Sequence, residues 1–215
     1  MKLVTRGRFI TFEGGEGVGK STQVRRLAGR LSGLGEVVVT REPGGSPGAE
    51  AIRALLVNGP VERWSPISET LLMYAARRDH IERVIAPALA RGAWVVCDRF
   101  HDSTRAYQGA AGGAPASLLR ALEADVVGDL VPDLTLILDL PAQAGLARAA
   151  SRGEHEGRFE AKGAEFHEAL RAAYLDIAAR EPERCRVIDA EGEPDAVAGR
   201  IWAELAGRWG RLGDG

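Results

Sequence analysis

Short apolar runs alternate with longer amphipathic segments along this chain. The longer segments repeat hydrophobic positions with helical spacing, for example in 21–35 and 68–92. The apolar runs are almost continuous rather than alternating, which is typical of parallel strands covered on both faces; they span 8–13, 36–40, 93–98, 134–140 and 185–190. The pattern predicts an α/β fold, a doubly wound five-stranded parallel sheet with helices on both faces.

Three segments fit neither a strand nor a helix pattern. Residues 41–48 and 99–115 follow the second and third expected strands, and ligands of doubly wound sheets bind at the carboxyl ends of the strands. Residues 151–163 are charged and interrupted by glycines. That composition is typical of a mobile lid, with an ordinary solvated turn as the alternative. We therefore expect one domain over residues 1–215, with a lid segment at about 148–163.

The composition is that of a globular protein without a basic surface. The 215 residues are 45% hydrophobic and carry a net charge of −2, so neither nucleic acid nor a membrane is an expected partner. No apolar stretch approaches the roughly 20 residues that span a bilayer, and the N-terminus lacks the apolar core of a signal peptide. Cys97 and Cys185 each lie in or beside an apolar run, which indicates buried thiols and a cytoplasmic protein.

A glycine-rich loop follows the first expected strand and precedes a helix. Its pattern, Gly14-x-x-x-x-Gly19-Lys20-Ser21, is that of a phosphate-binding P-loop. Backbone N–H groups converge on phosphate oxygens where side chains are absent, and the helix N-terminus adds partial positive charge. Lys20 is suited to the β- and γ-phosphates of ATP, and the Ser21 hydroxyl to Mg²⁺. Because the chain contains few lysines, we expect Lys20 to do what an arginine does not.

Three charged residues near this loop have more than one interpretation. Asp98 ends the run 93–98, where a Walker-B carboxylate holds Mg²⁺ through water; a turn or helix-capping aspartate is the alternative. Arg99 beside it is suited to bidentate binding of a phosphate. Glu16 lies inside the loop, where a carboxylate repels phosphate. It either points into solvent or lies near a second bound group, paired with a lid arginine.

Five stretches occur in the order found in bacterial thymidylate kinases, and the chain resembles that family over about residues 8–205. The combination of "TREPGG" with "AYQG" is specific to it among nucleotide kinases. The resemblance implies a P-loop kinase fold, a homodimer, and transfer of the γ-phosphoryl group of MgATP to dTMP, giving dTDP and ADP for dTTP synthesis. The stretches are "FEGGEGVGKST" (12–22), "TREPGG" (40–45), "YAARRDHIERVIAPAL" (74–89), "DRFHDSTRAYQG" (98–109) and "PDLTLILDL" (132–140).

The resemblance also implies a role for each matched position. Arg41 and Arg99 would hold the dTMP phosphate, Arg77 would reach the O4 edge of thymine, and Tyr107 would crowd out a 2′-hydroxyl. Asp98 and Ser21 would hold Mg²⁺. The ATP site would comprise Gly14, Gly15, Glu16, Gly17, Val18, Gly19, Lys20, Ser21 and Thr22. The dTMP site would comprise Arg41, Glu42, Pro43, Met73, Arg77, Arg99, Ser103, Thr104, Tyr107 and Gln108.

The resemblance leaves two points open: which arginine of the lid segment acts in transfer, and which side chain contacts the thymine base. Arg148, Arg152 and Arg158 lie in and around the lid segment, and one of them would neutralise charge on the transferring phosphoryl group. Arg158 fits the family motif best, followed by Arg152. At the position where family members commonly stack a phenylalanine on thymine, this chain has Met73. Met73 would lie against the base through its sulfur, or Tyr74 on another face of the helix would supply the ring.

Other functions remain open from the residues alone. A P-loop kinase acting on another nucleoside monophosphate or on a hydroxyl-bearing metabolite is the nearest alternative, against which "AYQG" and "TREPGG" argue. A P-loop ATPase that works by binding a partner would lack a nucleotide acceptor, and the short chain without a basic stripe disfavours it. The stretches 117–130 and 68–91 are apolar enough to form either a subunit interface or internal core.

Overall fold

The computed structural model describes residues 6–151 and 157–210. Their five strands form one parallel sheet in the order β2-β3-β1-β4-β5, and each lies within a residue of its expected range. The strands are β1 (Arg8–Glu13), β2 (Val37–Arg41), β3 (Trp94–Asp98), β4 (Leu134–Asp139) and β5 (Cys185–Asp189). The expected doubly wound α/β fold is confirmed.

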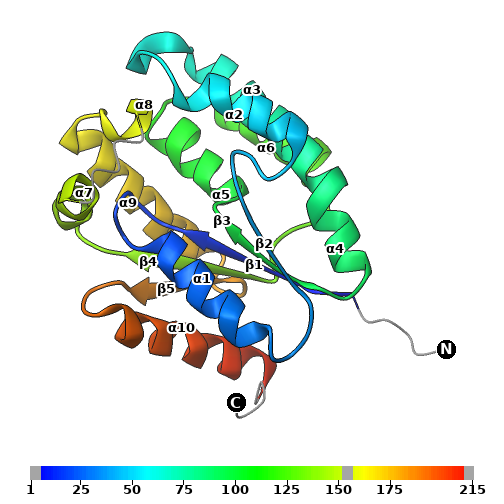
Figure 1. Ribbon diagram of the computed structural model, residues 1–215. Helices are drawn as coiled ribbons and strands as arrows, with labels where there is room; N and C mark the ends of the chain where they lie inside the picture. The colour runs from blue at the N-terminus through cyan, green and yellow to red at the C-terminus, as the bar shows by residue number, and fades with distance from the viewer. Residues whose placement is uncertain (1–5, 152–156, 211–215) are drawn as a thin grey trace.

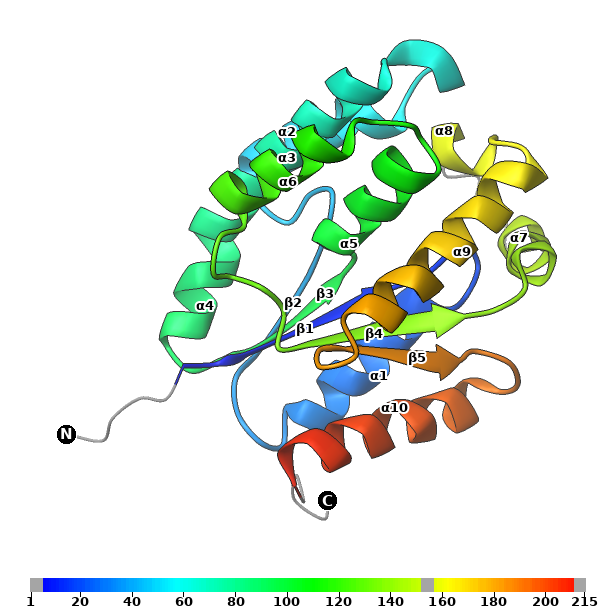
Figure 2. The ribbon, with the colours of Figure 1, turned by 180° about the vertical axis from the view of Figure 1, so that it is seen from behind.

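Helices cover both faces of this sheet (Figures 1 and 2). The α-helices are α1 (Lys20–Leu31), α2 (Pro47–Val57), α3 (Pro66–His80), α4 (Ala86–Ala90), α5 (His101–Thr104), α6 (Ala116–Val126), α7 (Ala142–Ser151), α8 (Gly157–Glu160), α9 (Ala164–Arg180) and α10 (Pro194–Trp209). A short 3₁₀ helix, η1 (Val61–Arg63), and two π-helical turns, η2 (Ile81–Ile85) and η3 (Arg105–Ala110), complete them. No helix in the described ranges is long and apolar enough to cross a bilayer.

Alternate residues of the central strand point into two separate apolar layers. Ile10 and Phe12 pack with helices α1 and α10, whereas Phe9 packs with α3, α4 and α6 on the other face. Thr11 pairs with Thr135 of β4 on that second face through a 2.9 Å hydrogen bond between their hydroxyls. Because the strands are buried on both faces, they read in the sequence as continuous apolar runs.

Two segments differ from the sequence expectation. The pattern of 99–115 predicts no helix, yet α5 and η3 occupy much of it. A π-helical turn has wider spacing than 3.6 residues, so helical periodicity does not reveal it; such turns often occur at functional sites. The helical pattern of 68–92 corresponds to α3, η2 and α4 in succession. The core includes Tyr74, Ile81, Ile85, Ala88 and Leu89 of this segment, and Leu119 and Val127 of 117–130.

Candidate active site

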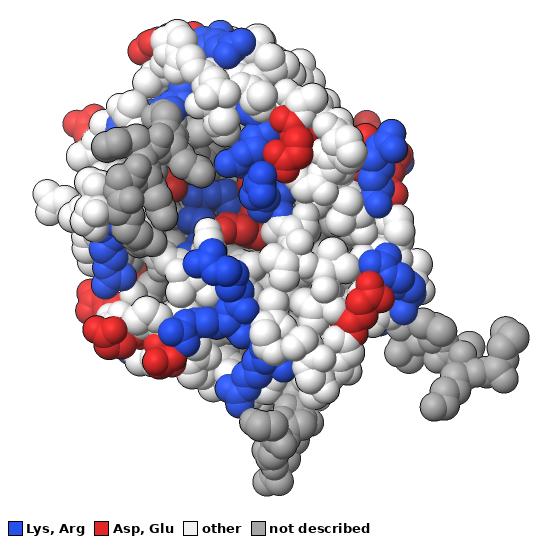
Figure 3. All heavy atoms as spheres, viewed as in Figure 1, with Lys and Arg blue, Asp and Glu red and all other residues white. Residues whose placement is uncertain are grey.

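A cleft opens at the carboxyl ends of β1, β2 and β3, with a cavity of about 350 Å³. Its walls come from the P-loop and α1, the loop after β2, helices α2 and α3, and the segment after β3. Figure 3 shows basic side chains gathered around this hollow. The cationic residues that line it, Lys20, Arg25, Arg41, Arg53, Arg77 and Arg99, outnumber the acidic ones, which suits an anionic ligand.

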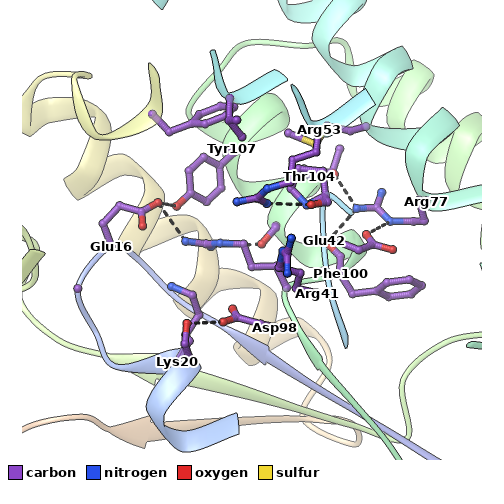
Figure 4. Close-up of a pocket in the computed structure, with 18 of the residues that line it drawn as sticks. Glu16, Lys20, Arg41, Glu42, Arg53, Arg77, Asp98, Phe100, Thr104 and Tyr107 are labelled. Atoms are coloured by element: carbon purple, nitrogen blue, oxygen red, sulfur yellow. Dashed lines mark hydrogen bonds and ion pairs between the residues drawn. The ribbon is translucent and has the colours of Figure 1, made fainter. Parts of the chain in front are cut away.

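Lys20 lies across the P-loop at the base of the cleft (Figure 4). Its Nζ donates hydrogen bonds to the carbonyls of Gly14, at 3.2 Å, and Gly15, at 2.6 Å. Burial and the neighbouring charge of Arg99 lower the pKa of Lys20 to about 8. A phosphate at this position would supply the negative charge that favours the protonated amine.

The P-loop glycines serve two different purposes. A Cβ at Gly17 would lie 1.8 Å from the carbonyl oxygen of Gly145, so Gly17 permits close packing of the loop on α7. Gly19 has open space around it but adopts φ 94°, a left-handed conformation at the start of α1. Gly17, Gly19, Ser21 and Thr22 line the cleft. Val18 instead buries its side chain in the α1–α10 core, so only its backbone is available to a phosphate.

Ser21 and Asp98 form a pair of oxygen ligands suited to Mg²⁺. The Ser21 hydroxyl donates to Asp98 Oδ2 at 2.8 Å, and both residues line the cleft. Within the described residues, no group of three or more His, Cys, Asp and Glu side chains could hold a metal. The two oxygens therefore fit an ion that takes most of its ligands from phosphates and water, as Mg²⁺ does.

Arg99 connects the two halves of the cleft. It has φ 71°, and no other residue besides glycine in the described ranges has a positive φ. Its guanidinium donates to the Gly14 carbonyl at 2.9 Å and to Glu16 at 3.0 Å. Burial alone would raise the pKa of Glu16, but Arg99 and Lys20 outweigh it and lower that pKa to about 2. Glu16 thus faces Arg99 and the hydroxyl of Tyr107 rather than pointing into solvent. The structure does not describe Arg152, so a contact between Glu16 and that lid arginine stays a prediction.

Arg77 lies at the far end of the cleft from the P-loop and is almost fully buried. Its Nε donates to Glu42 at 2.8 Å, and its Nη2 donates at 3.0 Å to both the Phe100 carbonyl and the Thr104 hydroxyl. The remaining nitrogen, Nη1, is buried and has no hydrogen-bond partner. A buried guanidinium nitrogen without an acceptor is costly, so this one indicates a ligand that accepts a hydrogen bond here.

Several expected acceptor-site residues lie on the walls around Arg77. Met73 lines the cleft one helical turn away on α3, whereas Tyr74 is buried in the core and does not line it. Met73, and not Tyr74, is therefore the side chain available to a ligand. The structure also places on the walls Arg41, Glu42, Pro43, Ser103, Thr104, Tyr107 and Gln108.

Five cleft residues were not anticipated from the sequence: Arg25, Arg53, Val57, Phe100 and Phe159. Arg25 follows the P-loop by one turn of α1, and Arg53 on α2 donates to the Pro43 carbonyl at 2.8 Å. Phe100 directly follows Arg99, and Phe159 of α8 lies edge-on to Tyr107 with ring centroids 5.6 Å apart. The "REPGG" loop that leads into α2 is a signal for Arg53, because it directs the start of that helix toward the cleft.

The two described lid arginines, Arg148 and Arg158, do not line the cleft in this structure, and a role for either in phosphoryl transfer stays a prediction. Arg158 does not line the cleft; it is buried and donates to the carbonyls of Leu56 and Val61 and to the carboxylate of Glu69. Its donors reach these acceptors because α8 packs on α2, the helix that carries Leu56. Arg152 lies outside the described residues. Arg148 donates to the Ala190 carbonyl at 3.2 Å.

The chain matches the family model for thymidylate kinase over residues 12–201. A thymidylate kinase of Caulobacter vibrioides is 70% identical over 199 residues, covering 92% of this chain and 95% of that protein. One of Bradyrhizobium diazoefficiens is 56% identical over 206 residues, covering 94% and 90%. The crystal structure of thymidylate kinase from Ehrlichia chaffeensis has a TM-score of 0.77 at 35% identity, covering 93% of this chain and 99% of that one. The chain therefore belongs to the thymidylate kinase family.

Proposed function

We propose that the chain transfers the γ-phosphoryl group of ATP to dTMP within this cleft, giving dTDP and ADP. ATP phosphates would lie on the P-loop, and dTMP would lie between Arg99 and Arg77. The observation that carries the acceptor assignment is the buried, unpartnered Nη1 of Arg77. Thymine presents the O4 carbonyl, an acceptor, to such a nitrogen.

The same nitrogen would discriminate between pyrimidines. Cytosine carries an amino donor in place of O4, so it would leave Arg77 Nη1 without an acceptor and oppose one donor with another. A site built around a hydrogen bond rejects an analogue that lacks it far more strongly than an apolar pocket rejects a methyl group. Met73 and Phe100 supply apolar surface beside Arg77 for the base. Uracil keeps O4, so dUMP would differ from dTMP only by the missing methyl contact.

The acceptor needs no general base. A phosphate monoester has a second pKa of about 6, so its oxygen is already anionic at neutral pH. The barrier is instead the repulsion between two anions brought together in line. Lys20 on the donor side and Arg99 between the two sites would offset this repulsion, and Arg41 and Arg53 would attract the acceptor phosphate. Mg²⁺ held by Ser21 and Asp98 would neutralise charge on the donor phosphates.

The sugar would lie against Tyr107. The Tyr107 hydroxyl donates to Glu16, and the Tyr107 ring lies 5.0 Å from the guanidinium carbon of Arg99. These two contacts fix the ring between the donor loop and the acceptor wall, where it would leave no room for a 2′-hydroxyl. Glu16, with its pKa at about 2, stays an ionised acceptor at neutral pH.

We also propose a homodimer in the cytoplasm. Ile67 and Leu71 are each 47% exposed and lie one turn apart on α3, and Leu55 on the adjacent α2 is 41% exposed. A paired copy would bury these side chains. Leu71→Asp would then convert the protein to a monomer in sedimentation analysis, and an unchanged mass would exclude this face. The two free buried cysteines, Cys97 and Cys185, are typical of a reducing compartment.

Steady-state kinetics with dTMP, dUMP, dCMP and dGMP at saturating MgATP tests the proposal. We expect the highest kcat/KM for dTMP, a lower value for dUMP, and almost no turnover of dCMP or dGMP. Turnover of dCMP at a rate comparable to that of dTMP would remove the O4 assignment of Arg77. ATP hydrolysis without any phosphorylated acceptor would remove the kinase assignment.

A further inference from the structure

A buried hydrogen-bond network supports Arg99 from behind and includes one residue of the cleft wall, Ser103. Its centre is Glu13, the last residue of β1, whose side chain is fully buried. Oε1 of Glu13 accepts from the Phe100 backbone N–H at 2.8 Å. Oε2 accepts from the Ser103 hydroxyl at 2.6 Å and from the Tyr174 hydroxyl at 3.1 Å. The carboxylate thus joins β1, the segment after β3 and helix α9.

Tyr174 is the member of this network that comes from farthest away in the sequence. It is 2% exposed and does not line the cleft. Burial raises the pKa of its phenol well above the ordinary value, so the hydroxyl keeps its proton at neutral pH. The hydroxyl lies 3.1 Å from Glu13 Oε2 and 2.9 Å from the Ser103 hydroxyl. The phenol oxygen also accepts from Arg99 Nη1, which donates to it at 3.2 Å.

Helix α9 holds the Tyr174 hydroxyl in a fixed place. Arg171, one turn earlier on α9, forms a two-pronged ion pair with Asp139 at the end of β4, with distances of 2.7 and 2.9 Å. The Tyr174 ring packs with Ile137 of β4 and Leu170 of α9. Figure 2 shows α9 lying along the same face of the sheet as α5. A hydroxyl on a rigid element keeps its geometry better than one on a loop.

Arg99 needs such support because its own backbone does not give it a relaxed position. Arg99 has φ 71°, a strained backbone conformation for a bulky residue. Such a conformation persists where surrounding contacts hold it in place. Nη1 is held by the Gly14 carbonyl, by Tyr174 and, at 3.4 Å, by Ser103; Nη2 is held by Glu16. With one edge fixed from behind, the guanidinium presents its remaining donors to the cleft.

We propose that Tyr174 is a positioning residue for phosphoryl transfer, whose hydroxyl, held by Glu13 and Ser103, orients the Arg99 guanidinium toward the acceptor phosphate without touching substrate. This inference rests on the role given to Arg99 in the proposed function. It assigns to the helix that follows the lid segment a direct effect on the chemistry of the cleft.

Tyr174→Phe tests the inference because it removes only the hydroxyl and keeps the packed ring. We expect kcat/KM for dTMP to fall about tenfold to a hundredfold, the range for a hydrogen bond to a charged group, with KM for ATP unchanged. The matched control is Tyr74→Phe, since the buried Tyr74 hydroxyl has no hydrogen-bond partner. Tyr74→Phe should keep kcat/KM within about twofold of the wild type. Thermal unfolding of both variants checks that each is folded.

A double-mutant cycle separates positioning from a general structural role. In an Arg99→Lys background the hydroxyl has no guanidinium to orient, so adding Tyr174→Phe should change kcat/KM by less than about twofold. If Tyr174 only supported the core, its loss would be as large in that background as in the wild type, and the inference would be overturned. Wild-type activity of Tyr174→Phe would overturn it as well. A wild-type protein that does not phosphorylate dTMP would remove the proposed function together with this inference.

Discussion

The guanidinium of Arg158 and the carboxylate of Glu69 form a buried ion pair that joins helix α8 to helix α3. The other oxygen of Glu69 accepts from Gln108 Nε2 at 2.7 Å, and Gln108 lines the cleft. The lid arginine expected from the sequence to act on the γ-phosphate thus contacts the wall of the proposed acceptor site through Glu69. In this structure Arg158 stabilises the packing of helix α8 against helix α3.

Arg158→Ala should therefore destabilise the fold. It leaves Glu69 buried without its charged partner, and breaking such a pair costs about 3–5 kcal/mol in the free energy of unfolding. Urea denaturation measures this change. The matched control is Arg180→Ala, because Arg180 pairs with Asp176 on the surface, with side chains 75% and 55% exposed; its cost should stay below about 1 kcal/mol.

The opposite result for Arg158 would be equally clear. If Arg158→Ala unfolds at the wild-type urea concentration while kcat falls steeply, the side chain leaves Glu69 during the reaction and acts on the phosphoryl group. The expectation from the sequence would then stand.

Lys20→Ala should nearly abolish turnover while the fold survives. The ammonium group lies at the P-loop, and no other lysine in the part of the chain that the structure describes lines the cleft. Its charge is therefore not replaced, and removing one such group lowers kcat by at least about 10²–10³-fold. Arg30→Ala serves as control, because Arg30 lies over Trp202 on the outer side of α1. Coupled measurement of ADP release and circular dichroism follow activity and fold separately. Substantial turnover by a folded Lys20→Ala protein would contradict the P-loop assignment.

Tyr107→Ala should relax the discrimination between deoxyribonucleotide and ribonucleotide acceptors. The ring that would exclude a 2′-hydroxyl is removed, so the ratio of kcat/KM for dTMP to that for its ribonucleotide analogue should fall. Tyr107→Phe keeps the ring but loses the bond to Glu16, so it should keep most of the discrimination. An unchanged ratio in Tyr107→Ala would place the sugar elsewhere.

Glu13 makes stability depend on pH in a direction opposite to that of most carboxylates. Burial and the neighbouring charge of Asp102 raise the pKa of Glu13 from 4.5 to about 7. Between these values the folded state binds more protons than the unfolded chain, so this group lowers stability as pH rises from 4.5 to 7. Well above pH 7 the decrease in the free energy of unfolding caused by Glu13 is complete.

Urea denaturation of the wild type and of Glu13→Gln at several pH values measures this effect. The stability of the wild type relative to Glu13→Gln should decline between about pH 5 and 7. Glu16 does not change the free energy of unfolding in this pH range. Its pKa of about 2 in the folded protein means that its contribution to stability is lost only at lower pH. Parallel pH profiles for the two proteins would show that Glu13 does not titrate there.

The sequence was sufficient for the sheet and for the donor side of the cleft. Continuous apolar runs locate all five strands because each strand is buried on both faces. The P-loop is local in sequence, so its spacing alone identifies Lys20 and Ser21. The family resemblance added Arg77 and Tyr107, which spacing alone does not connect with the P-loop.

Long-range partners could not be predicted in the same way. Tyr174 reaches Arg99 across 75 residues, and Arg158 reaches Glu69 across 89. Such pairs depend on how α8 and α9 pack on the sheet, which periodicity does not determine. In a chain with so many arginines, the residue type alone also does not separate Arg53, in the cleft, from Arg158, in the core.

A crystal structure with dTMP and a non-hydrolysable ATP analogue tests the central claim most directly, namely that two anionic ligands meet end to end across Arg99. The account predicts the triphosphate on the P-loop at Lys20, the dTMP phosphate at Arg99, and thymine O4 within hydrogen-bonding distance of Arg77 Nη1. A base bound elsewhere, with Arg77 Nη1 still unpartnered, would contradict it.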